Sequence, residues 1–171
     1  MADIYWDVSE TTWGPVFVAA ADDCVIGCTL PGRPHKAFLK ELQDILPDER
    51  FAKGSSPMLK EAFKQIKEYL TGKRMLFEVP IYIFGTDFQR KVWKALVEIP
   101  YGHTVSYADI AKKIKQPKAV RAVGTANGKN RAPMLVPCHR VVGADGALGG
   151  FSGGLDLKRK LLDLEFKRIA S

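Results

Sequence analysis

The chain has few of the residues that mark secreted, disulfide-rich or metal-clustered proteins. Its 171 residues include three cysteines and three histidines. Because an odd number of cysteines cannot all pair within one chain, no disulfide framework is expected, and a reducing, cytoplasmic setting is predicted. No apolar run approaches the roughly 20 residues that span a bilayer, and residues 1–6 lack a signal-peptide pattern. We therefore expect no membrane partner.

One group of residues could be considered for a metal ion. Cys24 and Cys28 are separated by three residues, and His35 follows them. A structural zinc site normally requires four ligands, and a fourth is missing from this group. We predict that the protein binds no metal and no other cofactor, and we interpret both cysteines as buried packing residues.

Charge is distributed unevenly between the two halves of the chain. Residues 1–84 hold 10 Lys and Arg against 12 Asp and Glu, whereas residues 85–171 hold 16 against 7. The basic half suits attraction to phosphates, although general solubility is an alternative explanation of the total charge of +7. The length permits two small domains. We predict an N-terminal scaffold domain with a linker over residues 1–84, and a functional domain over residues 85–171.

The first half predicts a small α/β domain with an antiparallel sheet. Residues 15–20 and 24–30 have the apolar runs typical of strands, and the acidic pair between them suits a hairpin turn. One helix is expected over residues 35–46. Another should begin after Ser56, with Pro57 as its first residue. Residues 73–85 are interpreted as the linker.

The second half predicts a mainly helical domain. Thr86 and Gln89 have the spacing of a capping box at the start of its first helix. Residues 106–114 and 119–127 predict two short helices joined by a tight turn, as in a helix-turn-helix. A last helix is expected over residues 155–169. The predicted fold class is therefore α+β with two domains, the second of them winged-helix-like.

Small side chains dominate the second short helix, and Arg121 is its single long one. A reader of the major groove normally presents several polar side chains to the base edges. A thin helix with one arginine instead suits close approach in the minor groove. The alternative is that the small residues merely allow tight packing between helices.

A potential nucleophile lies in the segment Pro137-Cys138-His139-Arg140-Val141. A thiol attacks as its thiolate, which a neighbouring base makes available near neutral pH. In an extended strand, Cys138 and His139 would point to opposite faces. The pair can therefore cooperate only if the backbone turns there or a water molecule bridges them, and Pro137 favours an irregular segment.

Seven further motifs accompany this segment. In chain order they are Thr86-Asp87-Phe88-Gln89, Ile99-Pro100-Tyr101-Gly102, Ser106-Tyr107, Arg121-Ala122-Val123-Gly124, Asn127-Gly128-x-Asn130, Gly150-Phe151-Ser152-Gly153-Gly154 and Leu161-Leu162-x-x-Glu165. Together they make residues 85–165 resemble the O6-alkylguanine-DNA alkyltransferases, also called methylated-DNA–protein-cysteine methyltransferases. Residues 1–84 share only the general plan of that family.

The resemblance implies direct-reversal DNA repair. Such proteins bind double-stranded DNA through the minor groove and flip the O6-alkylguanine out of the duplex. They then transfer the alkyl group irreversibly to their own cysteine, so each molecule acts once. The protein is expected to work as a monomer, and whether it binds DNA cooperatively is left open.

The resemblance also implies roles for individual residues. Cys138 would accept the alkyl group, His139 would act as the base through a water molecule, and Glu165 would orient His139. Tyr107 would donate a hydrogen bond or proton to the leaving guanine, and Asn130 would brace the turn before the cysteine. From spacing alone, Tyr107 could instead be a core residue and Glu165 a solvated charge.

The same resemblance implies a DNA-binding surface and an alkyl pocket. Arg121 would fill the space that the flipped base leaves. The other residues implied on the DNA side are Ala119, Ala122, Thr125 and Arg131, and those implied around the pocket are Val141, Phe151, Ser152 and Gly153.

Two positions depart from the family pattern. Phe151 stands where Tyr or Trp is common, which affects the expected range of alkyl groups. Arg131 stands where proline usually follows the asparagine, and its charge could contact phosphate. Two other functions remain open: a non-catalytic damage sensor, against which the presence of Cys138 argues, and a cysteine hydrolase, for which an oxyanion-hole signature is missing.

Overall fold

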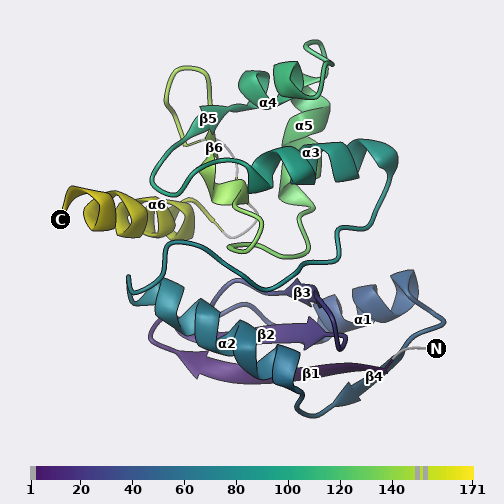
Figure 1. Ribbon diagram of the computed structural model, residues 1–171. Helices are drawn as coiled ribbons and strands as arrows, with labels where there is room; N and C mark the ends of the chain where they lie inside the picture. The colour runs from purple at the N-terminus through teal and green to yellow at the C-terminus, as the bar shows by residue number, and fades with distance from the viewer. Residues whose placement is uncertain (1–2, 149–150, 152–153) are drawn as a thin grey trace. The chain divides into compact units, whose positions relative to one another are not determined.

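Two units make up the chain, Met1–Tyr82 and Ile83–Ser171, where the sequence predicted a boundary after residue 84. The structure, a computed structural model, describes residues 3–148, 151 and 154–171 (Figure 1). The fold class is α+β, with a small sheet in the first unit and mainly helices in the second. None of the helices in the described part of the chain has the length and apolarity needed to cross a membrane.

The first unit is built on a four-stranded sheet with the order β3-β2-β1-β4. Its strands are β1 (Asp3–Thr11), β2 (Gly14–Ala20), β3 (Val25–Cys28) and β4 (Arg50–Lys53). The predicted antiparallel pairing holds for β1, β2 and β3, but β4 lies parallel to β1. Neither β1 nor β4 was predicted, because neither has the continuous apolar run by which β2 was recognised.

The centre of this sheet is buried on both faces. All residues of β2 from Val16 to Ala20 are buried, and α2 (Pro57–Leu70) packs against β1, β2 and β3. Phe17 contacts Phe38 of α1 (Lys36–Ile45) edge-on and stacks on the ring of His35. His35 is therefore a packing residue. In the described residues no group of three or more His, Cys, Asp and Glu side chains could hold a metal ion.

Local signals set both ends of α2. The Ser56 hydroxyl accepts a hydrogen bond from the Leu59 amide, and Pro57 is the first helical residue, as predicted. At the other end Gly72 has a φ of 75°, which a side chain would disfavour. Its amide donates to Tyr69, while the Lys73 amide donates to Glu68, so a Schellman motif closes the helix.

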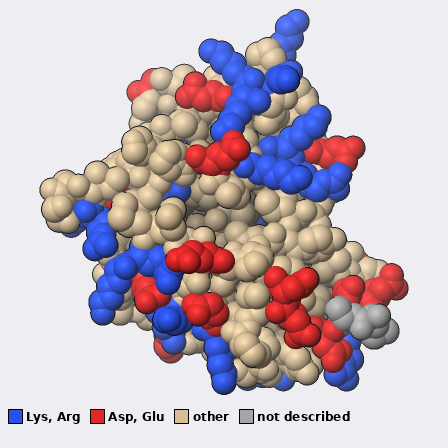
Figure 2. Space-filling view, viewed as in Figure 1, with Lys and Arg blue, Asp and Glu red and all other residues tan. Residues whose placement is uncertain are grey.

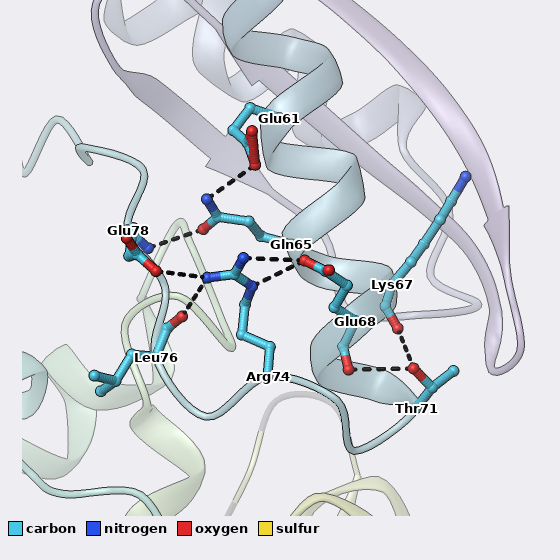
Figure 3. A network of polar contacts seen from close by, with 8 residues as sticks. All are labelled: Glu61, Gln65, Lys67, Glu68, Thr71, Arg74, Leu76 and Glu78. Atoms are coloured by element: carbon cyan, nitrogen blue, oxygen red, sulfur yellow. Dashed lines mark hydrogen bonds and ion pairs between the residues drawn. The ribbon is translucent and has the colours of Figure 1, made fainter.

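The segment after α2, which the sequence predicted to be a linker, is hydrogen-bonded to other parts of the first unit. Arg74 donates to the carboxylates of Glu68 and Glu78, at 3.0 and 3.1 Å, and the Glu78 amide donates to Gln65 (Figure 3). Further along, the amides of Val25 and Tyr82 bond the carbonyls of Pro80 and Val25. Residues 73–82 are thus held to α2 and to the edge of the sheet.

Helices form most of the second unit. Its elements are α3 (Asp87–Val97), β5 (Val105–Ser106), α4 (Tyr107–Lys113), α5 (Val120–Gly128), a 3₁₀ turn η1 (Cys138–Arg140), β6 (Val141–Val142) and α6 (Leu155–Ala170). Helices α3, α4 and α5 pack against one another, and β5 pairs in parallel with β6 (Figure 1). The predicted helices are confirmed to within a few residues at each end.

Capping boxes start two of these helices. Thr86 and Gln89 bond reciprocally at α3, as predicted, and Ser106 and Asp109 do the same at α4. The hydrogen bonds from Ser106 lower the pKa of Asp109. In the short connection from α4 to α5, Lys115 adopts a φ of 62°, which reverses the chain without a glycine.

Candidate active site

The backbone turns sharply at the cysteine segment. Pro137, with φ −80° and ψ 64°, is the centre of an inverse γ-turn in which the Cys138 amide donates to Val136 at 2.8 Å. Cys138 to Arg140 then form one 3₁₀ turn. The irregular backbone that the sequence required is therefore present, and it sends neighbouring side chains in directions that a strand would not allow.

The Cys138 thiol is nearly buried, with 3% of the residue exposed. Burial raises its pKa to about 11, although the Asn130 side chain, the Lys158 charge and the amides of Cys138 and His139 act to lower it. The thiol is therefore protonated at neutral pH. Chemistry at this sulfur requires a base that removes the proton as the reaction proceeds.

His139 is positioned to supply such a base. It is completely buried, and its Nε2 lies 2.6 Å from Oε2 of Glu165 on α6. Burial lowers the pKa of His139, so the imidazole is neutral at pH 7. With Nε2 donating to the carboxylate, the basic lone pair resides on Nδ1. An imidazole held by a buried carboxylate in this way is able to act as a general base.

Glu165 is buried and accepts charge-assisted hydrogen bonds from several neighbours, so it is not a solvated charge. Arg140 donates to it through Nε at 2.8 Å and Nη2 at 3.0 Å, and the Gly102 amide donates at 3.0 Å. Burial alone would raise the pKa of Glu165, but the bonds and charges of His139 and Arg140 hold it at about 2. The carboxylate therefore stays ionised. Sequence reasoning missed Arg140 as a site residue, although it stands inside the quoted motif.

Two asparagines brace the chain on either side of the turn. Asn130 donates through Nδ2 to the Val136 carbonyl at 2.8 Å, and its Oδ1 accepts from the Ala132 amide at 3.0 Å. Asn127, on α5, donates to the Cys138 carbonyl at 3.3 Å. Asn130 therefore contacts the chain just before the cysteine, and the contact of Asn127 was not anticipated. Both contacts tie the end of α5 to the cysteine segment.

A pocket of about 460 Å³ lies against α4 and α5, and one of its lining residues, Asn127, bonds the Cys138 carbonyl. Its lining includes Tyr107, Arg121, Thr125 and Phe151, each of which was predicted from the sequence as a candidate site residue. Burial raises the pKa of Tyr107, and a Cys138 thiolate would raise it further, so the hydroxyl is protonated and can donate. Gly124 faces the Tyr107 ring, and an added Cβ would make an ordinary van der Waals contact with it at 3.8 Å.

The outward face of α5 is exposed and thin. Arg121, Ala122 and Thr125 are exposed, whereas Val123 and Ala126 between them are buried. Ala119 precedes the helix as its N-cap. On the face shown in Figure 2, Lys and Arg side chains gather over the region of α3 to α5, while Asp and Glu are more frequent over the first unit.

The other predicted residues have different settings. Arg131 donates to the Phe84 carbonyl at 2.8 Å, and its guanidinium carbon lies 4.9 and 5.3 Å from the ring centroids of Phe84 and Trp93. These contacts favour a structural role for Arg131 over the expected contact with phosphate. Val141 is fully buried in β6. Ser152 and Gly153, both predicted around the pocket, lie outside the described residues.

Known proteins that are similar to this chain carry names of one family. The family model "6-O-methylguanine DNA methyltransferase, DNA binding domain" matches residues 87–167. A methylated-DNA–protein-cysteine methyltransferase of Methanosarcina barkeri is 41% identical, covering 95% of this chain and 97% of the relative. The constitutive enzyme of that name from Bacillus subtilis is also 41% identical, with 94% of each chain covered.

Solved structures agree with these sequence matches. The crystal structure of Mycobacterium tuberculosis OGT in complex with DNA superimposes with a TM-score of 0.81 at 36% identity. The match covers 96% of this chain and 94% of that protein. It therefore extends over the sheet unit as well as the helical unit, beyond the range of the family model.

Proposed function

This chain belongs to the methylated-DNA–protein-cysteine methyltransferases, and from that membership we propose that it repairs O6-alkylguanine in duplex DNA by moving the alkyl group irreversibly to Cys138. The observation that carries the proposal is the buried Cys138 thiol next to the His139–Glu165 pair. A protonated thiol beside a neutral, oriented imidazole is arranged for one proton transfer coupled to nucleophilic attack.

The reaction exchanges one bond for another. A water molecule relays the Cys138 proton to His139, and the sulfur attacks the alkyl carbon. The bond between that carbon and O6 breaks, and its electron pair stays on guanine. Tyr107 supplies the proton or hydrogen bond that neutralises the leaving base, and its hydroxyl is then reprotonated with the proton taken from the thiol. The products are S-alkylcysteine and unmodified guanine, and nothing in the cycle restores the thiol.

DNA binding is assigned to the helical unit. Helices α4 and α5 act as a helix-turn-helix, and α5 enters the minor groove with its thin face, including Ala119, Ala122 and Thr125, against the backbone. Arg121 occupies the space of the flipped base, and the base itself enters the pocket beside Tyr107 and Phe151. The excess of basic residues after residue 84 supplies attraction to phosphate.

One experiment separates this activity from the two alternatives. The protein is incubated with a short duplex that contains O6-methylguanine, and the intact mass of the protein is recorded. The proposal predicts a stoichiometric gain of one methyl group. Tight DNA binding without any mass change would instead indicate a damage sensor, and continued substrate turnover without a stable adduct would indicate a hydrolase.

A variant and a salt series complete the test. Cys138→Ser should lose transfer and keep DNA binding, so retained transfer would refute the assignment of the acceptor. Binding of the unmodified duplex should weaken as salt rises, because phosphate contacts release counterions. A flat salt dependence would contradict the role of the basic half.

A further inference from the structure

Lys158 is the one lysine among the described residues that is fully buried; it lies on α6 with an exposed fraction of 0%. Lysine is almost never buried to this degree unless a partner compensates its charge. In the described part of the chain, its ammonium forms no ion pair with a carboxylate. The surroundings of Nζ must therefore explain why the charge is tolerated there.

Two carbonyls and two aromatic rings surround this ammonium. Nζ donates to the Val141 carbonyl at 2.6 Å and to the Leu148 carbonyl. It also lies 5.9 Å from the ring centroid of Tyr107 and 5.8 Å from that of Phe151. Val141 directly follows the 3₁₀ turn that carries the cysteine. Lys158 therefore joins β6, the segment at Leu148 and both aromatic walls of the pocket.

The charge also acts on the reacting groups. The positive charge of Lys158 lowers the pKa of Cys138, against the larger effect of burial, and it lowers that of His139 as well. Burial lowers the pKa of Lys158 itself, whereas a Cys138 thiolate raises it. Arg140 and Glu165, the other charged groups at the turn, are already paired with each other. Among the described residues at the turn, Lys158 is the cation that no carboxylate neutralises.

We propose that Lys158 is a positioning residue for the transfer reaction: it holds the Val141 and Leu148 carbonyls in place and puts a positive charge beside Cys138 as the sulfur loses its proton. The inference rests on the proposed function, since it assumes that Cys138 is the alkyl acceptor.

The test replaces Lys158 by Met, which keeps the length of the side chain and removes its charge. Lys167→Met is the matched control, because it makes the same change on an exposed residue of the same helix. Single-turnover methyl transfer is measured at saturating duplex across a pH series. The variant should be slower by on the order of tenfold throughout the pH range in which the Cys138 thiol is protonated, and the gap should narrow only as the thiol ionises near its pKa of about 11.

A second readout works without DNA. Alkylation of Cys138 by iodoacetamide, followed on its tryptic peptide, should shift to higher pH in Lys158→Met and stay unchanged in Lys167→Met. If wild-type protein transfers no methyl group, the proposed function fails, while the iodoacetamide profile still tests Lys158. Equal transfer rates in Lys158→Met and wild type, or an iodoacetamide profile of Lys158→Met that coincides with the wild type, would overturn the inference.

Thermal unfolding and circular dichroism establish whether Lys158→Met folds. If Lys158→Met does not fold, Lys158→Arg is used instead, because it retains the charge. The pH profile of its reaction with iodoacetamide is then the deciding measurement. Its iodoacetamide reaction should keep the pH dependence of the wild type even if transfer is slowed by the larger side chain. A shift of that profile to higher pH would contradict the electrostatic role.

Discussion

Replacing Glu165 by Gln should cost a large part of the stability of the helical unit. The change removes the negative charge that accepts bonds from His139, Arg140 and Gly102, and it leaves the Arg140 guanidinium buried without a counter-charge. The pKa of Glu165 is about 2 in the folded state against an ordinary 4.5. That difference corresponds to about 3 kcal/mol. Breaking a buried ion pair by removing one partner costs a similar amount, about 3–5 kcal/mol.

The pH dependence follows from the direction of the shift. A carboxyl whose folded pKa is depressed contributes stability above its unfolded pKa, and that contribution is lost as pH falls through the folded value. The difference between wild type and Glu165→Gln should therefore be full at pH 7 and decline between about pH 4.5 and pH 2.

The assay is chemical unfolding of both proteins at pH 7 and pH 3, followed by tryptophan fluorescence. Asp163→Asn is the control, since it removes a carboxylate from an exposed position of the same helix and should change stability by less than about 0.5 kcal/mol. A loss below about 1 kcal/mol for Glu165→Gln at pH 7 would refute the reasoning from the buried ion pair. So would a loss that is undiminished at pH 3.

Three further predictions concern other parts of the helical unit. Arg131→Ala should lower stability by about 2 kcal/mol, because a charged hydrogen bond and two ring contacts are lost, yet leave the transfer rate at saturating DNA unchanged; a large fall in that rate would show a direct role. Arg121→Ala should slow transfer on duplex DNA at least tenfold and much less on a single strand, because the flipped base costs a few kcal/mol only in a duplex; equal losses on both substrates would contradict its role. Gly102→Ala should destabilise the unit by roughly 1–3 kcal/mol, since Gly102 has a φ of 78° and an added Cβ would lie 2.3 Å from Ile169. Gly128→Ala, where a Cβ meets nothing within 4 Å, is the control, and matching melting temperatures for the two variants would contradict the strain argument.

Features that depend on neighbouring residues could be predicted from the sequence. Ser56 with Pro57, and Thr86 with Gln89, start helices where their spacing indicated, because a cap is formed within one turn of chain. An irregular segment at Pro137 was likewise expected, because proline restricts the local backbone, although the sequence left open whether a turn or a bridging water would join Cys138 to His139.

Features that depend on tertiary pairing could not be predicted in this way. Strand β4 is short and half-exposed, and its pairing with β1 joins segments more than 40 residues apart. Arg140 and Glu165 are 25 residues apart, so no local pattern indicates their ion pair. The burial of Lys158 contradicts the usual preference of lysine for solvent, and only the packing of α6 against the cysteine turn shows it.

The central claim is that Cys138 is consumed by the reaction. The most direct measurement mixes limiting protein with excess duplex that contains O6-methylguanine, counts the lesions repaired per protein molecule, and identifies the methylated tryptic peptide. The account predicts that repair stops at one lesion per molecule, with the methyl group on the Cys138 peptide. Repair beyond one equivalent, or a methyl group on the peptide of Cys24 or Cys28, would contradict it.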